Sequence, residues 1–599
     1  MVQSHQEVDM YITVSGKGAS RVVQIKEDAR IPGTSRKKSK VLRTLGKYSD
    51  MLAEDPGFLE KLKAEMRRKT LEQKASRTPI TVQLASDPIL HDSDVTASYR
   101  FGHAIVKQLW SILDLDAFFD TVMDKRNKKA IEAALFYLAA HRLSEPDSVL
   151  ATTRDQHGAA GLVPVGLDVF YQVLGVLAEH KTALIGHLAS YSEKHTQRER
   201  AHAFYDVTTY AFESTKWGDL RLFGFSKDHK SQEVQVVMGL LIDNQGLPIS
   251  YELFPGNTMD QNTLVDSVQS LKELYHLDEI TVVADQGLNG KENLVYLQEE
   301  GHHFVIGYTL KRASEEMKAL VFADSDSWKA ESTDAETGDV LYKSRTVVQS
   351  LEVKVLLSGQ EKPQTAGKRG RPRMYKTVEI PVNVHLTWSR KRALKDATDR
   401  QRVLDRLQKK LAKPSLLKAS LKRGGNQYLT LDIDTDHCRL DEHKIAEAEQ
   451  YDGYYAVMTD RMELSTSEVV SIYKGLWRIE ESFRILKTDL QARPVFVWSD
   501  THVQGHFALC YLSLYMIRLL QHRLEQQGMN FSAEQIMEGM HNPLALVQGT
   551  YPSMVVTPTK IPQSYLEMAK MLELPNLMTN MTLTQFRSAT KLDLSVNLT

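Results

Sequence analysis

Apolar residues recur at steps of three and four along residues 472–490, the spacing typical of one buried helix face. At 100° per residue, Glu480 lies about 100° round from that face. Tyr473 and Lys487, seven residues to either side of Glu480, fall close to it on the helix. Glu481 points elsewhere, so the sequence predicts that the two adjacent carboxylates are not equivalent. The apolar face comprises Ile472, Leu476, Ile479, Phe483, Leu486 and Leu490.

Two aspartates upstream lie in or beside predicted strands. Asp206 falls within AHAFYDVTTYAF, a run rich in aromatic and β-branched residues, and Asp285 directly follows the buried strand ITVVA. The other predicted elements are a hairpin (234–242 and 247–254), two helices (262–275 and 292–300) and a final strand (302–308). This order is that of a ribonuclease H-like mixed sheet, in which Asp206, Asp285 and Glu480 converge at one edge.

Three carboxylates on separate elements suit Mg²⁺ or Mn²⁺, which prefer hard oxygen ligands. Two such ions about 3.5–4 Å apart can activate a water or a 3′-hydroxyl and stabilise the leaving oxygen of a phosphodiester. Cys438 and Cys510 are the only cysteines, which excludes a cysteine zinc site and a disulfide framework. His502 and His506 have the spacing of a metal pair but no HExxH motif, so packing or a DNA-backbone contact is favoured.

These blocks resemble those of DDE transposases of bacterial insertion sequences, in the branch with a Tyr-x2-Arg-x3-Glu-x6-Lys helix. Tyr473, Glu480 and Lys487 fall at the family positions, and FYDVTT, GFSKDHK and VVADQGL look like the other family blocks. One position departs from the pattern. The family arginine four residues before Glu480 is Leu476 here, which completes the apolar face but removes a phosphate-binding cation.

The resemblance implies roles for individual residues. Two metal ions would be held by Asp206, Asp285 and Glu480. Side chains that would contact DNA are Tyr473, Lys487, Lys227 and Lys230. Arg484 or Arg478 would replace the missing arginine, and Arg484 is the better candidate because it lies on the Glu480 side of the helix.

The charge of the chain is strongly segregated. Residues 1–90 hold 17 Lys and Arg against 11 Asp and Glu, a net of +6, and residues 361–424 hold 19 against 5, a net of +14. Since the whole chain has a net charge of −1, the remainder sums to −21. Basic patches of this kind are the footprint of a polyanion partner, although solvated basic helices give similar counts.

The pattern predicts an α/β multidomain fold with a ribonuclease H-like sheet interrupted by an insertion. The regions are a basic strand and helix module (1–95), a helical region (96–195), the catalytic core (196–309 and 465–520), a β-rich insertion domain with a long basic helix (310–464), and a helical C-terminal region (521–599). The first module suits either recognition of DNA ends or dimerisation.

The segment GKRGRPR within the insertion contains Lys368, Arg369, Arg371 and Arg373. It resembles an AT-hook, whose Arg-Gly-Arg-Pro core can lie in a narrow minor groove. A basic loop joining two strands explains the same residues equally well. In either case these cations are candidate DNA contacts.

The expected function is a Mg²⁺-dependent DNA transposase that binds the terminal inverted repeats of its element, cuts the strands and transfers them to target DNA. Its partners would be double-stranded DNA and a second copy of the chain, since two ends must be brought together. The N-terminal residues give no signal peptide and the apolar run 507–520 is too short to span a bilayer, so we expect a prokaryotic cytoplasmic, nucleoid-associated protein without a membrane partner. The alternatives are an inactive DNA-binding relic or regulator of the same fold, and a ribonuclease H-like nuclease.

Overall fold

The computed structural model describes thirteen stretches of the chain. They are residues 8–30, 37–75, 97–123, 128–196, 202–225, 232–275, 279–288, 290–323, 327–356, 375–411, 428–432, 437–549 and 554–598. These residues form two units, which we describe separately. One unit comprises Met1–Ala97, Leu546–Pro558 and Leu577–Gln585, and the other comprises Ser98–Ala545, Thr559–Asn576 and Phe586–Thr599.

The first unit contains the predicted strand and helix module. Its antiparallel strands are β1 (Val8–Ser15), β2 (Val22–Arg30) and β3 (Lys37–Lys47), followed by helices α1 (Tyr48–Glu54) and α2 (Phe58–Ala75). Val23, Phe58 and Met66 are buried in this small module. The unit also contains most of β17 (Val555–Thr559), which pairs with β18 (Met581–Thr582).

The second unit is built on a large mixed sheet. Within the described residues nine strands follow the order β10-β11-β12-β15-β9-β8-β5-β6-β7. The predicted core strands are β5 (His202–Ala211), β6 (Gln235–Ile242), β7 (Pro248–Pro255), β8 (Thr281–Ala284) and β9 (His303–Gly307). β5, β6 and β7 are antiparallel neighbours, whereas β8 is parallel to both β5 and β9. The predicted helices are α9 (Leu264–Tyr275) and α10 (Lys291–Glu299), so the mixed α/β core follows the hydrophobic pattern of the chain.

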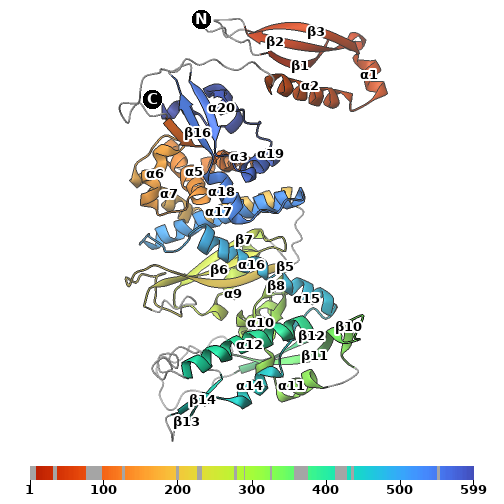
Figure 1. The fold of residues 1–599 in the computed structure, drawn as a ribbon, viewed down its shortest axis with the longest axis vertical. Coiled ribbons are helices and arrows are strands. Elements are labelled where there is room, and N and C mark those ends of the chain that lie inside the picture. Colours follow the sequence, from red (N-terminus) through yellow and green to blue (C-terminus); the bar gives the residue numbers. More distant parts are fainter. Residues whose placement is uncertain are drawn as a thin grey trace. The chain divides into compact units, whose positions relative to one another are not determined.

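Most strands of the insertion continue this sheet, and the short pair β13 (Leu429–Asp432) and β14 (His437–Leu440) forms a separate two-stranded sheet. The long strands β11 (Val340–Leu356) and β12 (Tyr375–Ser389) pair with each other, β12 pairs with β15 (Tyr454–Thr459), and β15 pairs with β9. A physical reason is that β9 would otherwise be an edge with unpaired backbone N–H and C=O groups. The region is β-rich, and the predicted basic helix is α12 (Arg390–Leu411), which packs on β11 and β12 (Figure 1). Its other elements are β10 (Lys329–Thr333), α11 (Glu315–Phe322) and α14 (Glu442–Glu449).

The region preceding β5 is helical, as predicted. After the short β4 (Ala97–Arg100) come α3 (Ala104–Ile112), α4 (Leu115–Val122), α5 (Lys128–Ser144), α6 (Val149–Asp155), α7 (Leu167–Glu179) and α8 (Lys181–His195). The C-terminal region is less purely helical than predicted. It contains α18 (Ala533–His541), α19 (Gln563–Met571) and α20 (Leu583–Thr590), but also β16 (Leu544–Gln548) and the β17–β18 pair.

Helix α17 (Asp500–Gln526) is the central helix of the second unit and packs on α5 and α7. In the described part of the chain it is the one helix long and apolar enough to cross a membrane, and 94% of its most apolar window is buried inside the protein. It approaches α7 closely because Gly505 has no side chain: a Cβ there would lie 2.0 Å from the Leu174 carbonyl oxygen. Of the two roles predicted for His506, packing or a DNA-backbone contact, the structure supports packing, since its ring is buried beside the Ala492 carbonyl and burial lowers its pKa to about 3.

Candidate catalytic site

Asp206 and Asp285 lie side by side on neighbouring parallel strands. Tyr205 of β5 is in register with Ala284 of β8, so the next residue on each strand is one of the two aspartates. In each aspartate, Oδ1 accepts a hydrogen bond from the following backbone N–H at 2.7 Å. Asp206 is half-buried and Asp285 is exposed at the end of its strand. The two aspartates therefore meet at one edge of the sheet, as the sequence predicts.

The predicted continuous helix from Tyr473 to Lys487 is wrong in one respect, because it consists of three segments. These are α15 (Thr466–Lys474), α16 (Trp477–Arg484) and a π-helical turn, Ile485–Asp489. The first break lies at Gly475, where a Cβ would come within 2.5 Å of Cζ of Phe204 on β5. Tight turns replace the α-helical pattern there, with the Leu476 N–H donating to the Tyr473 carbonyl at 3.1 Å. The angles expected for Tyr473 and Lys487 relative to Glu480 therefore do not hold.

Within α16 the apolar face and the inequivalence of the two glutamates follow the prediction. Ile479, Phe483 and Leu476 are buried, and Glu480 is exposed. Glu481 instead accepts a hydrogen bond from the buried guanidinium of Arg518 at 2.8 Å. Glu481 therefore forms an ion pair within the protein, whereas the Glu480 carboxylate is exposed.

Glu480 and Asp285 act on the same hydroxyl group. Burial raises the pKa of Tyr455 on β15, and the negative charges of Asp285 and Glu480 raise it further. Helix α16 also packs against β5, the strand that carries Asp206. The three carboxylates thus come from β5, the end of β8 and α16, and α16 and β5 are in contact.

The ligand oxygens of this triad do not form a tight cluster. Among the described residues, the group of acidic and histidine side chains whose ligand atoms all lie within 4.8 Å of one another comprises His141 on α5, Glu145 directly after α5 and Asp155 at the end of α6. That group has no sequence signal beyond the i,i+4 spacing of His141 and Glu145.

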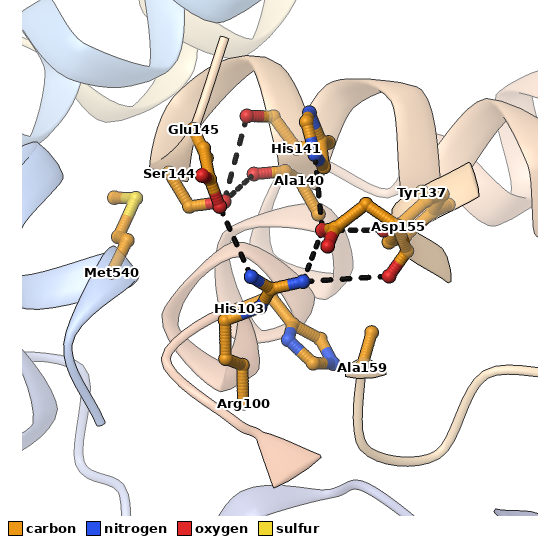
Figure 2. Close-up of a pocket in the computed structure, with 10 residues that line it drawn as sticks. All are labelled: Arg100, His103, Tyr137, Ala140, His141, Ser144, Glu145, Asp155, Ala159 and Met540. Atoms are coloured by element: carbon orange, nitrogen blue, oxygen red, sulfur yellow. Dashed lines mark hydrogen bonds and ion pairs between the residues drawn. The ribbon is translucent and has the colours of Figure 1, made fainter. Parts of the chain in front are cut away.

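Figure 2 shows why the cluster on α5 and α6 differs from a metal site: a cation of the protein already lies in it. The guanidinium of Arg100 contacts Glu145 at 3.0 Å and also bonds Asp155, and Nε2 of His141 lies 3.3 Å from the same Asp155 oxygen. Burial opposes ionisation of Asp155, but the hydrogen bonds from His141 and Arg100 outweigh it and hold the pKa of Asp155 well below its usual range. The cluster is a charge-paired network that ties β4 to α5 and α6.

The predicted DNA-binding cations near Glu480 have partners within the protein. Nζ of Lys487, in the π-helical turn, lies 5.5 Å from the centre of the Tyr210 ring. Arg484 forms an ion pair with Asp489 at 3.1 Å, and the Arg478 guanidinium lies 5.1 Å from the exposed Trp477 ring. Leu476, at the family arginine position, is 9% exposed and packs in the core. The predicted contacts Lys227, Lys230, Lys368, Arg369, Arg371 and Arg373 lie outside the described residues.

Tyr473, predicted to contact DNA, points to a carboxylate of the triad. Its hydroxyl donates to Oδ1 of Asp285 at 3.3 Å, and its ring centre lies 5.6 Å from that of Tyr455. Cζ of Arg392, at the start of α12, lies 4.4 Å from the centre of the Tyr455 ring. An open cleft of about 480 Å³ begins beside Asp285 and is lined by residues such as Gln286, Tyr455 and Arg392. Sequence reasoning missed Tyr455 and Arg392 because no local pattern brings them to Asp285.

Comparison with known proteins bears on this arrangement. Residues 197–348 match the family model of the transposase DDE domain. The matched region contains both Asp206 and Asp285, whereas Glu480 lies beyond it.

Comparison with solved structures gives distant likenesses. The chain is similar to the piggyBac transposase in a cryo-EM synaptic complex with hairpin DNA, at 10% identity and a TM-score of 0.35, over 74% of this chain and 77% of that one. It is also similar to the Mos1 transposase in a paired-end complex with the left transposon end, at 12% identity and a TM-score of 0.13, over 40% of this chain and 66% of that one. No curated protein sequence matches the chain.

Proposed function

We propose that the protein is a DNA transposase that cuts and joins phosphodiester bonds at the ends of its element. The observation that carries this proposal is the pair Asp206 and Asp285 on the adjacent strands β5 and β8, inside the region that matches the transposase DDE domain. Glu480 on α16 supplies the third carboxylate. The fourth acidic side chain nearby, Glu481, is used by Arg518.

The three carboxylates fit divalent metal ions by their chemistry. All are hard oxygen donors, which Mg²⁺ and Mn²⁺ prefer, and Asp285 and Glu480 are exposed. We propose that Asp206, Asp285 and Glu480 hold two such ions. Bound metal would lower the pKa of an attacking water or 3′-hydroxyl and neutralise charge on the leaving oxygen.

Residues of the protein supply the rest of the reaction. The short hydrogen bonds from the Val207 and Gln286 N–H groups orient the two aspartates, so little conformational freedom is lost when they bind cations. Lys487 would contact a phosphate of the DNA end, with Arg478 as the cation that replaces the family arginine, because Arg484 already pairs with Asp489.

We further propose that the protein acts as a homodimer on two ends, in the cytoplasm at the nucleoid.

The test is cleavage of a supercoiled plasmid that carries the gene with its native flanking DNA. With Mg²⁺ we expect breaks at the element ends and joining of the released 3′-hydroxyls to a second DNA, and with EDTA neither product. Cleavage at random positions without joining would indicate a nuclease. End binding without any cleavage in either condition would indicate an inactive regulator, and both outcomes would contradict the proposal.

A further inference from the structure

A hydrogen bond joins Tyr473, which the sequence predicts to contact DNA, to Asp285, which it predicts to bind metal. The Tyr473 hydroxyl lies 3.3 Å from Oδ1 of Asp285, the same oxygen that accepts from the Gln286 N–H. Oδ1 is therefore held by two donors. We propose that Tyr473 is a positioning residue that fixes the Asp285 carboxylate in the orientation that receives a divalent cation. This inference rests on the proposed function, since it assumes that Asp285 is a metal ligand.

Gly307 at the end of β9 makes room for this hydroxyl. A Cβ on residue 307 would lie 2.6 Å from the Tyr473 hydroxyl oxygen and 3.3 Å from the backbone nitrogen of Gln286. The first distance is shorter than any ordinary van der Waals contact, so a side chain at 307 would push the hydroxyl away from Asp285. The backbone of Gly307 is not in the left-handed region, and the requirement for glycine is therefore one of space.

The Tyr473 ring is held in place by a second aromatic side chain. The Tyr455 ring on β15 lies 5.6 Å away, inclined by 54°, and the Arg392 guanidinium covers the Tyr455 ring at 4.4 Å. Aromatic and cation–π contacts of this kind each stabilise a structure by about 0.5–1.5 kcal/mol. Together they restrict the motion of the Tyr455 and Tyr473 rings. Strand β15 of the insertion therefore contributes Tyr455 to the contacts around Asp285.

The Tyr473 hydroxyl donates its proton to Oδ1 of Asp285. A protonated phenol can donate to one carboxylate oxygen and leave the other free for a cation. Groups that hold a metal ligand in this way contribute about 10–100-fold to metal affinity or activity.

The test is Mn²⁺ binding to the full-length protein, measured by electron paramagnetic resonance in the absence of DNA. We expect Tyr473→Phe, which removes only the hydroxyl, to weaken Mn²⁺ binding about tenfold. Gly307→Ala keeps the hydroxyl but displaces it, so it should weaken binding similarly. Because the two variants perturb the structure differently, each keeps the test valid if thermal denaturation shows that the other is misfolded.

Tyr137→Phe is a matched control, because the Tyr137 hydroxyl also donates to a carboxylate, Oδ2 of Asp155, at 3.4 Å. It should leave Mn²⁺ binding unchanged. Wild-type affinity in folded Tyr473→Phe, together with loss of binding in Asp285→Asn, would overturn the positioning role and leave the proposed function standing. Wild-type affinity in Asp285→Asn would instead contradict the metal role of Asp285, and with it the proposed function.

Discussion

Replacing Glu480 with glutamine is expected to reduce DNA cleavage at the element ends about 1,000-fold or more while the protein stays folded. Glutamine keeps the size of the side chain but removes the charge that would bind metal, and loss of several kcal/mol of transition-state stabilisation corresponds to about this factor. Glu480 is exposed, so its replacement leaves no buried group without a partner. The measurement is the initial rate of strand cleavage on the plasmid substrate in Mg²⁺, with the circular dichroism spectrum recorded in parallel.

The adjacent residue provides the control. Glu481→Gln leaves Glu480 in place and keeps an oxygen that can accept from the Arg518 guanidinium, so we expect cleavage within about threefold of wild type and a loss of stability of about 1–2 kcal/mol. The opposite pattern, with Glu481→Gln inactive and Glu480→Gln active, would show that the apolar face of α16 does not select the catalytic carboxylate.

Replacing Arg518 with methionine is expected to destabilise the second unit by about 3 kcal/mol. Arg518 is 8% exposed and lies on α17, and its guanidinium donates to Glu481, to the Ser482 hydroxyl and to the Arg478 carbonyl at 2.8–2.9 Å. Methionine fills much of the same volume, but it leaves the Glu481 charge and the fully buried Ser482 hydroxyl without this donor. The cost is at the lower end for a broken buried pair because Glu481 is 27% exposed.

Urea unfolding followed by tryptophan fluorescence measures this loss of stability. Arg523→Met, on the same helix, is a suitable comparison because Arg523 contacts only the Tyr191 hydroxyl among the contacts described, and its loss should cost less than about 1 kcal/mol. The double variant Glu481→Gln/Arg518→Met should lose less than the sum of the two single variants, since both remove one interaction. Additive losses would mean that the pair does not hold α16 to α17.

Local patterns predicted the core sheet because each strand carries its own signal. The runs of β-branched and aromatic residues gave β5 to β9, and the positions of Asp206 and Asp285 in those strands placed the two aspartates at one edge. The three-residue and four-residue recurrence of apolar positions likewise separated Glu480 from Glu481. The individual strands and the choice of Glu480 depend on residues close together in the sequence, whereas the meeting of the two aspartates was expected from the order of the elements along the chain.

Features that depend on distant contacts were not predictable in the same way. The helix break at Gly475 exists because the chain meets Phe204, and no pattern within the helix indicates that contact. The extension of the sheet requires β15 to pair with β9, whose residues are about 150 positions away. Tyr473 and Asp285 are 188 residues apart, so only the folded structure turns a predicted DNA contact into a partner of the carboxylate.

Metal ligation by the two strand-borne aspartates can be tested by changing the ligand atom. In Asp206→Cys and Asp285→Cys a soft sulfur replaces a hard oxygen, which Mg²⁺ accepts poorly and Mn²⁺ accepts more readily. The decisive measurement is plasmid cleavage by these variants in Mg²⁺ and in Mn²⁺, with Glu481→Cys as the control. We predict that neither aspartate variant cleaves detectably in Mg²⁺, and that each cleaves at least about tenfold faster in Mn²⁺ than in Mg²⁺. Glu481→Cys should cleave at similar rates with the two metals. Cleavage at the wild-type rate in Mg²⁺ by either aspartate variant would contradict the proposal that this aspartate binds the catalytic metal.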